Sequence, residues 1–413
     1  MSSPTIDGDG AKAAVKTGPG GASPSPPEPR GTPSSVTGFL LGGAGMFATM
    51  YSTQAILPEL SAEFDVSPSR AGLTVSAVVA AVAVAAWFWG PLSDRIGRPR
   101  AIRLASWLLV LPTVGVALAP SFPVLLTCRA LQGLCMPGLL VVGAPYVVET
   151  LVPHFGERVM GWYVGALVFG GLVGRVGVAL ATGVVGWRAA TGALVLFPLA
   201  GAIRMGSGLI DAASPVRSER PLRRLVDGPL LAVTLTGSAL FFAFVGTFTF
   251  VVYRLQEPPF DLGLQTASLV FFLWLTGAIG PMVGRLAERL GWHRMLVAGI
   301  TLSATGIAAT VADVLPLVIV GLACVTVAMF TGYTSSMLGV GAVASSNRGA
   351  ASAFFFSVYY IVGAFGAYLP GIAWERSGWY GVAGCNLVAL AIAAVAAAVL
   401  GRRLAMRAVP SAS

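Results

Sequence analysis

The chain has 413 residues, of which 56% are hydrophobic and only 10% are charged. Soluble domains carry about 25% charged residues, so this composition excludes a water-soluble surface over most of the chain. The formal net charge of +9 does not indicate a nucleic-acid partner, because Lys and Arg lie at the ends of apolar runs rather than on one soluble face.

The first 35 residues are rich in Gly, Ser and Pro and have no apolar periodicity, which predicts a disordered tail. No apolar core precedes Gly38, so this tail is not typical of a secretory signal. Apolar runs follow that are long enough to cross about 30 Å of hydrocarbon as helices. The twelve predicted spans are 37–57, 70–91, 101–119, 122–147, 159–181, 187–205, 229–252, 264–284, 294–312, 314–336, 350–372 and 379–400.

The longest interior polar stretch, residues 206–228, divides these spans six and six and is expected to be a cytoplasmic linker. It separates a predicted bundle at 36–205 from one at 229–403, and residues 404–413 are expected to form a second cytoplasmic tail. With both termini cytoplasmic, most Lys and Arg residues lie inside, as the positive-inside rule requires. The outer side then holds only Arg70, Arg188, Arg254 and Arg376.

The sequence therefore predicts an all-α integral membrane protein with twelve transmembrane helices in two six-helix bundles. We expect it to be a multi-pass protein of the cell's inner or plasma membrane and a functional monomer. A charged, glycine-flanked hairpin at residues 90–100 recurs, weakened, at 284–294, and Gly186-Trp187 recurs as Gly378-Trp379. Landmarks that recur at a constant offset indicate that the second bundle repeats the first.

The first hairpin resembles the cytoplasmic loop signature of the major facilitator superfamily, and with the six-plus-six pattern the resemblance covers about residues 36–403. It implies the fold of that superfamily and a gate that opens and closes the cytoplasmic side. The residues assigned to this gate are Gly90, Leu92, Asp94, Arg95, Gly97, Arg98, Arg100, Glu149 and Arg158.

Asp94 can pair with Arg95 or Arg98, or lie at the positive N-terminal end of another helix. In the family the matching aspartate faces the start of the eleventh helix, which the capping residues 345–347 (Ser345, Ser346 and Asn347) mark here. Such a contact would join the halves only when the cytoplasmic side is closed. By the same resemblance Glu149 is expected to pair with Arg98 or Arg158; the alternative is a solvated helix end.

Arg129 lies several residues inside the fourth span, where an arginine costs about 2.5–3.5 kcal/mol on insertion scales and usually faces the bundle interior. The run from Arg129 to Gly133 resembles a motif of drug and proton antiporters in which the arginine is implicated in proton coupling. The alternative is that Arg129 satisfies backbone carbonyl groups of a broken neighbouring helix.

In the fifth span, Gly170, Gly171 and Gly174 precede Arg175 where the antiporter branch has a proline-containing glycine motif. The glycines permit close helix contact. With Arg175 in place of that pattern, the span is more similar to the YnfM-type inner-membrane transporters of the bacterial drug and metabolite efflux branch. Arg175 is assigned, with Arg129, to coupling; it could bind an anion or extend to the outer interface.

The first and seventh spans contain no carboxylate, so a cavity that bears Arg129 or Arg175 favours neutral or anionic substrates. No metal or cofactor is expected, because the cysteines lie singly in apolar runs and both histidines lie in short charged loops. Since helices 1, 4, 7 and 10 line the pathway in the family, the substrate-binding candidates are Tyr51, Gln54, Gln132, Phe241, Phe244, Phe248 and Tyr333.

The leading hypothesis is a secondary transporter that works by alternating access and exports a small hydrophobic drug or metabolite against a proton gradient. A symporter or facilitator of an organic anion is the alternative within transport. A non-transporting membrane receptor or scaffold is the alternative from another class. An enzyme is not expected, because the spans contain no Ser/His pair, no histidine-rich cluster and no paired acids.

Overall fold

The apolar runs form helices because a backbone that crosses lipid must satisfy its own N–H and C=O groups. The computed structural model describes residues 33–206, 208–210, 228–344 and 348–408, and every regular element among them is helical. Nearly all of the predicted tail at 1–35 and of the linker at 206–228 lies outside the described residues. The helical ends extend further than predicted: the first helix begins at Pro33, whose fixed φ suits a first turn, and the last continues to Ala408.

The first half is a bundle in which α1 packs against α9 and α11 while α5 packs against α3 and α4. Three short helices and two π-helical segments, η2 and η3, interrupt its longer helices. Its elements are α1 (Pro33–Met50), η1 (Gln54–Ile56), α2 (Leu57–Phe64), α3 (Pro68–Ile96), α4 (Arg98–Ala117), α5 (Phe122–Cys135), α6 (Pro137–Leu140), α7 (Gly143–Tyr146), η2 (Val147–Leu151), α8 (Val152–Phe155), α9 (Arg158–Leu172), η3 (Val173–Gly177), α10 (Val178–Ala193) and α11 (Leu196–Met205).

The second half is built around α12, which packs against α16, α17 and α18, while α15 packs against α16. Its eighth predicted span is a 3₁₀ segment, η5, flanked by two short α-helices. The elements are α12 (Gly228–Gln256), α13 (Leu264–Ser268), η5 (Leu269–Ile279), α14 (Gly280–Leu290), α15 (Trp292–Ala309), α16 (Leu315–Val343), α17 (Arg348–Gly366) and α18 (Leu369–Ala408).

Seven helices of the described residues are long and apolar enough to cross a membrane, or up to eight if the bent pair 264–277 and 282–290 is one span. Two of them break sharply, at Gly186 and at Ser377–Gly378, and each covers two predicted spans. All twelve predicted ranges overlap described helices. The all-helical membrane fold is thus confirmed, whereas the count of twelve spans stays a prediction.

The charged hairpin and its weaker copy have the same backbone turn. Gly97 separates α3 from α4 with φ +88° and ψ 142°, and Gly291 separates α14 from α15 with φ +88° and ψ 137°. Glycine adopts a positive φ without the steric penalty that a Cβ brings. The two hairpins therefore share conformation as well as sequence, which supports duplication of the half.

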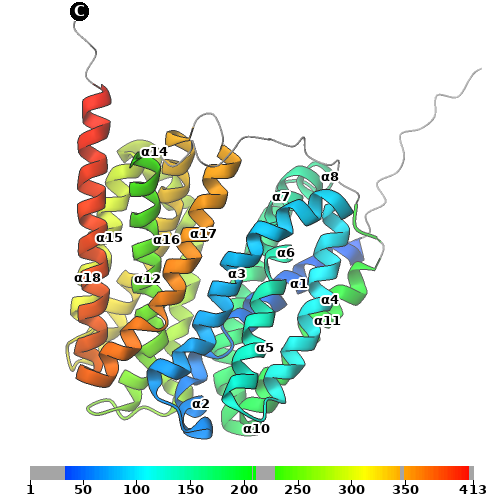
Figure 1. Ribbon diagram of the computed structural model, residues 1–413, viewed down its shortest axis with the longest axis horizontal. Coiled ribbons are helices and arrows are strands. Elements are labelled where there is room, and N and C mark those ends of the chain that lie inside the picture. The colour runs from blue at the N-terminus through cyan, green and yellow to red at the C-terminus, as the bar shows by residue number, and fades with distance from the viewer. Residues whose placement is uncertain (1–32, 207, 211–227, 345–347, 409–413) are drawn as a thin grey trace, which may run out of the picture.

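The two halves converge at one end of the molecule and separate toward the other, as Figure 1 shows for α3 and α17. We call the end that carries the α3–α4 hairpin the loop end and the opposite one the far end. Hydrogen bonds join the halves from Ser76 Oγ to the Ala364 carbonyl at 2.7 Å and from the Ser69 N–H to Glu375 Oε1 at 3.2 Å. Both first-half partners lie in the far-end part of α3, so the halves are joined there.

Candidate functional site

A break in the first membrane helix creates the centre of the candidate site. α1 ends at Met50 and residues 51–53 form a turn, so carbonyl groups at the end of α1 lose their helical partners. Arg129 of α5 donates to two of them, from Nη1 to Thr49 O at 2.5 Å and from Nη2 to Met50 O at 2.6 Å. Its Nε donates to Thr74 O at 2.9 Å. The side chain of Arg129 therefore joins α5 to the backbones of α1 and α3.

Every hydrogen-bond acceptor of the fully buried Arg129 among the described residues is neutral, including Ser52 Oγ and Gln132 Oε1. This is the arrangement expected if the arginine satisfies the carbonyl groups of a broken helix; its role in proton coupling stays a proposal. Gln132 also donates from Nε2 to Thr113 Oγ1 at 3.1 Å. Its amide is thus engaged within the first half, and Gln132 lies outside the cavity lining described below.

Close packing of α9 on α1 positions the second arginine. A Cβ at Gly170 or Gly174 would lie inside van der Waals contact of the carbonyl oxygens of Ala44 and Ala48, so these small residues let the backbones meet. The contact is with α1 of the same half, and it places η3 beside the broken end of α1. Arg175 lies in η3, a π-helical segment of the kind often found at functional sites.

Arg175 is buried between the halves, with 1% of the residue exposed. Its guanidinium carbon lies 3.8 Å from the ring centroid of Tyr51 and 4.6 Å from that of Trp274. Nε donates to Gln54 Oε1 at 2.8 Å, and Nη1 donates to Gly171 O at 3.2 Å. The alternative in which Arg175 extends to the outer interface is therefore wrong for this conformation, because the side chain turns inward onto the aromatic rings.

The rings offset part of the cost of burying this cation, since a desolvated cation–π contact contributes about 2 kcal/mol. They supply no counter-charge, and the effective penalty for a buried ion is several kcal/mol. Gln54 extends the contact across the molecule, because its Nε2 donates to Thr249 Oγ1 of α12 at 3.2 Å. The broken end of α1 therefore connects Arg175 to the second half.

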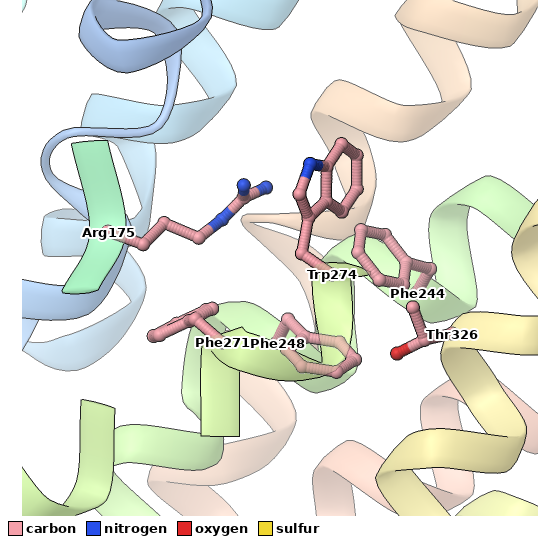
Figure 2. Close-up of a pocket in the computed structure, with 6 residues that line it drawn as sticks. All are labelled: Arg175, Phe244, Phe248, Phe271, Trp274 and Thr326. Atoms are coloured by element: carbon pink, nitrogen blue, oxygen red, sulfur yellow. The ribbon is translucent and has the colours of Figure 1, made fainter. Parts of the chain in front are cut away.

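A small cavity lies where Arg175 meets the second half, and Figure 2 shows its guanidinium directed toward the indole of Trp274. The side chains close the cavity so tightly that it has no room for a water molecule in this conformation. One cation thus faces walls that are otherwise mainly aromatic. The lining residues are Arg175, Phe244, Phe248, Phe271, Trp274 and Thr326.

Two buried N–H groups at this cavity have no hydrogen-bond partner among the described residues: Nη2 of Arg175 and Nε1 of Trp274. A Cβ at Gly171 would lie 3.1 Å from that indole nitrogen and 3.2 Å from Nη1 of the guanidinium, so both side chains approach the same point beside α9. No lining residue carries a carboxylate. The arrangement can therefore accept a hydrogen-bond acceptor, and an anionic acceptor most favourably.

The substrate-binding candidates predicted from sequence fall into separate groups. Phe244 and Phe248 line the cavity, and Tyr51 and Gln54 contact its arginine.

Phe241 instead stacks on Tyr359 with ring centroids 4.2 Å apart, and Tyr333 lies 5.9 Å from Tyr359. These three residues form a second aromatic cluster within the second half.

At the loop end, Arg98 forms an ion pair with Glu149 in η2, and the exposed Arg158 forms none among the described residues. The half-buried Asp94 likewise has no ion pair within the described part of the chain. Its expected partners, residues 345–347, lie outside the described residues, so the gate stays a prediction.

The other hairpin residues lie at or near the surface of the loop end. Leu92 and Gly97 are half-buried, Arg95 and Arg100 are exposed, and no atom lies within 4 Å of a Cβ built at Gly90.

Trp274, Phe271 and Thr326 were missed by the sequence analysis, although they line the cavity. The predicted candidates came from helices 1, 4, 7 and 10. They therefore exclude η5, in which Phe271 and Trp274 lie one turn apart and face the site. An available signal was the arginine within the fifth span, because a buried cation needs rings or anions around it.

The family model for the Major Facilitator Superfamily matches residues 39–337. The Bacillus subtilis protein YybF, described as an uncharacterised MFS-type transporter, is 27% identical over 381 residues, with 89% of this chain and 93% of YybF covered. The Escherichia coli inner membrane transport protein YnfM is 29% identical, with 91% of this chain and 93% of YnfM covered.

Solved transporter structures share the fold. A bacterial homologue of the human lysosomal transporter Spinster, in an inward-facing and occupied conformation, has a TM-score of 0.74 at 15% identity and covers 89% of this chain and 96% of its own. The D323A mutant of the nucleoside transporter NupG has a TM-score of 0.73 at 11% identity and covers 89% and 99%. At these identities the likeness shows the fold alone.

Proposed function

We propose, from the premise that this chain belongs to the Major Facilitator Superfamily, that it exports a small, largely hydrophobic drug or metabolite by alternating access, in exchange for protons. That the chain is a multi-pass membrane transporter follows from its family and its apolar helices. The observation that carries the finer proposal is the aromatic cavity with Arg175, which lies between the two halves, and described hydrogen bonds also join these halves at the far end.

The loop end is assigned to the cytoplasm. The α3–α4 hairpin with Arg95, Arg98 and Arg100 and the C-terminal end of α18 lie at the loop end (Figure 1), and the positive-inside rule then puts both termini inside. Under this assignment the described hydrogen bonds join the halves on the outer side, and α3 and α17 separate toward the cytoplasmic side (Figure 1).

Two carboxylates give alternating access a physical basis. Glu375, in α18, accepts from the N–H of Ser69 at the start of α3, where the helix dipole favours a negative charge. Asp94, near the end of α3, is proposed to do the same at the start of α17. We infer that the protein alternates between these contacts, so that one end of the α3–α17 pair is joined while the other is open.

Export in exchange for protons rests on the resemblance of the run Arg129–Gly133 to the antiporter motif. We test it with a panel of aromatic acids and amides in vesicles that contain the purified protein and a pH-sensitive dye. Exit of an internal compound should acidify the lumen, and loss of the gate in Asp94→Asn should slow the exit. Alkalinisation of the lumen during exit would refute antiport, and absence of any Asp94-dependent flux would favour a receptor or scaffold.

The organic-anion symporter or facilitator remains a second candidate, because the cavity contains a cation and no lining carboxylate. It differs in the direction of proton movement. In the same vesicles a symporter moves protons out of the lumen with the anion, and a facilitator moves none.

A further inference from the structure

We propose that Arg175 and Trp274 form a binding site for the anionic group of an aromatic monocarboxylate, which is the substrate class of the transporter. The proposal rests on the proposed transport function and adds to it the chemistry of the substrate. Its basis is the pair of buried N–H donors, Arg175 Nη2 and Trp274 Nε1, that have no partner among the described residues.

Two N–H donors at the cavity lack an acceptor among the described residues. Arg175 donates from Nε to Gln54 and from Nη1 to the carbonyl of Gly171, and its Nη2 has no hydrogen-bond partner among the described residues. The indole nitrogen faces the guanidinium across the cavity (Figure 2). A guanidinium and an indole can only donate, so two such donors cannot satisfy each other. A carboxylate has two oxygens and could accept from both.

The charge of the site selects an anion over a neutral acceptor. Arg175 is buried, and its ring contacts with Tyr51, Phe271 and Trp274 do not neutralise it. No side chain that lines the cavity or contacts the guanidinium carries a negative charge. A ligand carboxylate would therefore be the first counter-charge that this cation meets.

The aromatic side chains that line the cavity favour a ligand that contains an aromatic ring. Phe244 and Phe248 line the side of the cavity away from the guanidinium, with ring centroids 4.7 Å apart, whereas Phe271 lies beside Arg175, its centroid 5.7 Å from the guanidinium carbon. Faces and edges of rings pack well on another aromatic ring. In this conformation the cavity has no room for a water molecule, so a ligand ring enters only when these aromatic side chains move apart.

The test compares three probes that share a naphthalene ring and differ in the group attached to it: 1-naphthoate is an anion, 1-naphthamide is neutral and 1-naphthylmethylammonium is a cation. Their binding to the full-length protein in lipid nanodiscs is measured by calorimetry. Wild type should bind the acid at least about tenfold more tightly than the amide, and the ammonium ion least, because hydrogen bonds to charged groups are the strong ones. No binding of 1-naphthoate to wild type, or equal affinity for acid and amide, would overturn the proposal.

Variants separate the site from the fold. Arg175→Gln should remove the preference for acid over amide, Arg175→Lys should keep part of it, and Trp274→Phe should reduce it by several-fold while leaving the aromatic wall. Arg294→Gln, which removes an exposed arginine elsewhere, is the matched control and should change nothing. If Arg175→Gln does not fold, unchanged acid preference in both Arg175→Lys and Trp274→Phe would refute the assignment.

Transport is measured separately in vesicles, so the two proposals fail differently. Naphthoate binding that depends on Arg175 without any flux would support the site and refute transport of this class. Flux of the neutral amide that is unaffected by Arg175→Gln would support transport and refute the anion site.

Discussion

Gly72 lies in the far-end part of α3, against Ala367, the residue that follows α17. A Cβ added there would meet the carbonyl oxygen of Ala367 about 1.2 Å inside the 3.4 Å at which ordinary van der Waals contact begins. Both neighbours on that side, Ala367 and Phe250, belong to the second half, so the clash is between halves. The methyl group added by Gly72→Ala is therefore accommodated only if α3 and the segment around Ala367 move apart, which opens the far end.

Overpacking of this kind costs about 1–3 kcal/mol, which shifts a two-state equilibrium roughly 5- to 150-fold. The nearby hydrogen bond from Ser76 to the Ala364 carbonyl joins the same two helices, α3 and α17, and would lengthen as they move apart. Its loss costs about a further 0.5–1.5 kcal/mol. We expect Gly72→Ala to shift the population from the conformation closed at the far end toward the one open there.

The assay is the distance between spin labels at Ala62 in α2 and Thr266 in α13, two exposed far-end residues, one in each half. The four native cysteines are replaced first. Gly72→Ala should broaden the distribution toward longer distances. Gly165→Ala is the matched control, because it adds the same methyl group to a helix where no atom lies within 4 Å of the new Cβ.

An unchanged, short distance distribution in folded Gly72→Ala would refute the reasoning. It would mean that the carbonyl of Ala367 moves aside at little cost and that the contact between α3 and α17 does not determine which conformation is more populated.

Three further substitutions test the other contacts. Glu375→Gln weakens the bond to the Ser69 N–H by removing its charge and should lengthen the same label distance, and an unaltered distance would exclude Glu375 as a far-end contact. Glu149→Gln removes an ion pair whose carboxylate is half exposed, so melting should change by no more than about 1 kcal/mol while flux falls; a normal flux would argue against a gating role. Arg129→Ala leaves backbone carbonyls unpaired at about 1–3 kcal/mol each and should lower the melting temperature by many degrees. Normal melting with a shifted pH profile of transport would instead support proton coupling through Arg129.

The local chemistry of the chain already determined much of this molecule. Apolar runs long enough to cross a bilayer must be helical, because lipid offers the backbone no other partner, and the hairpins at Gly97 and Gly291 turn as their sequence pattern required. The Gly170–Gly174 spacing likewise predicted a close helix contact, since small residues permit it in any partner.

Only the tertiary structure decided which partner each polar group meets. Arg129 and Arg175 are both buried inside the membrane, yet they bond differently. Every nitrogen of the Arg129 guanidinium group donates to a described residue, two of them to carbonyl groups of the broken α1, whereas Nη2 of Arg175 has no partner among the described residues. Sequence alone could not separate them, because the difference depends on where α1 breaks and on η5 of the other half facing η3. The position of an arginine within a span follows from the sequence, whereas its burial and its hydrogen-bond partners depend on residues far away in the chain.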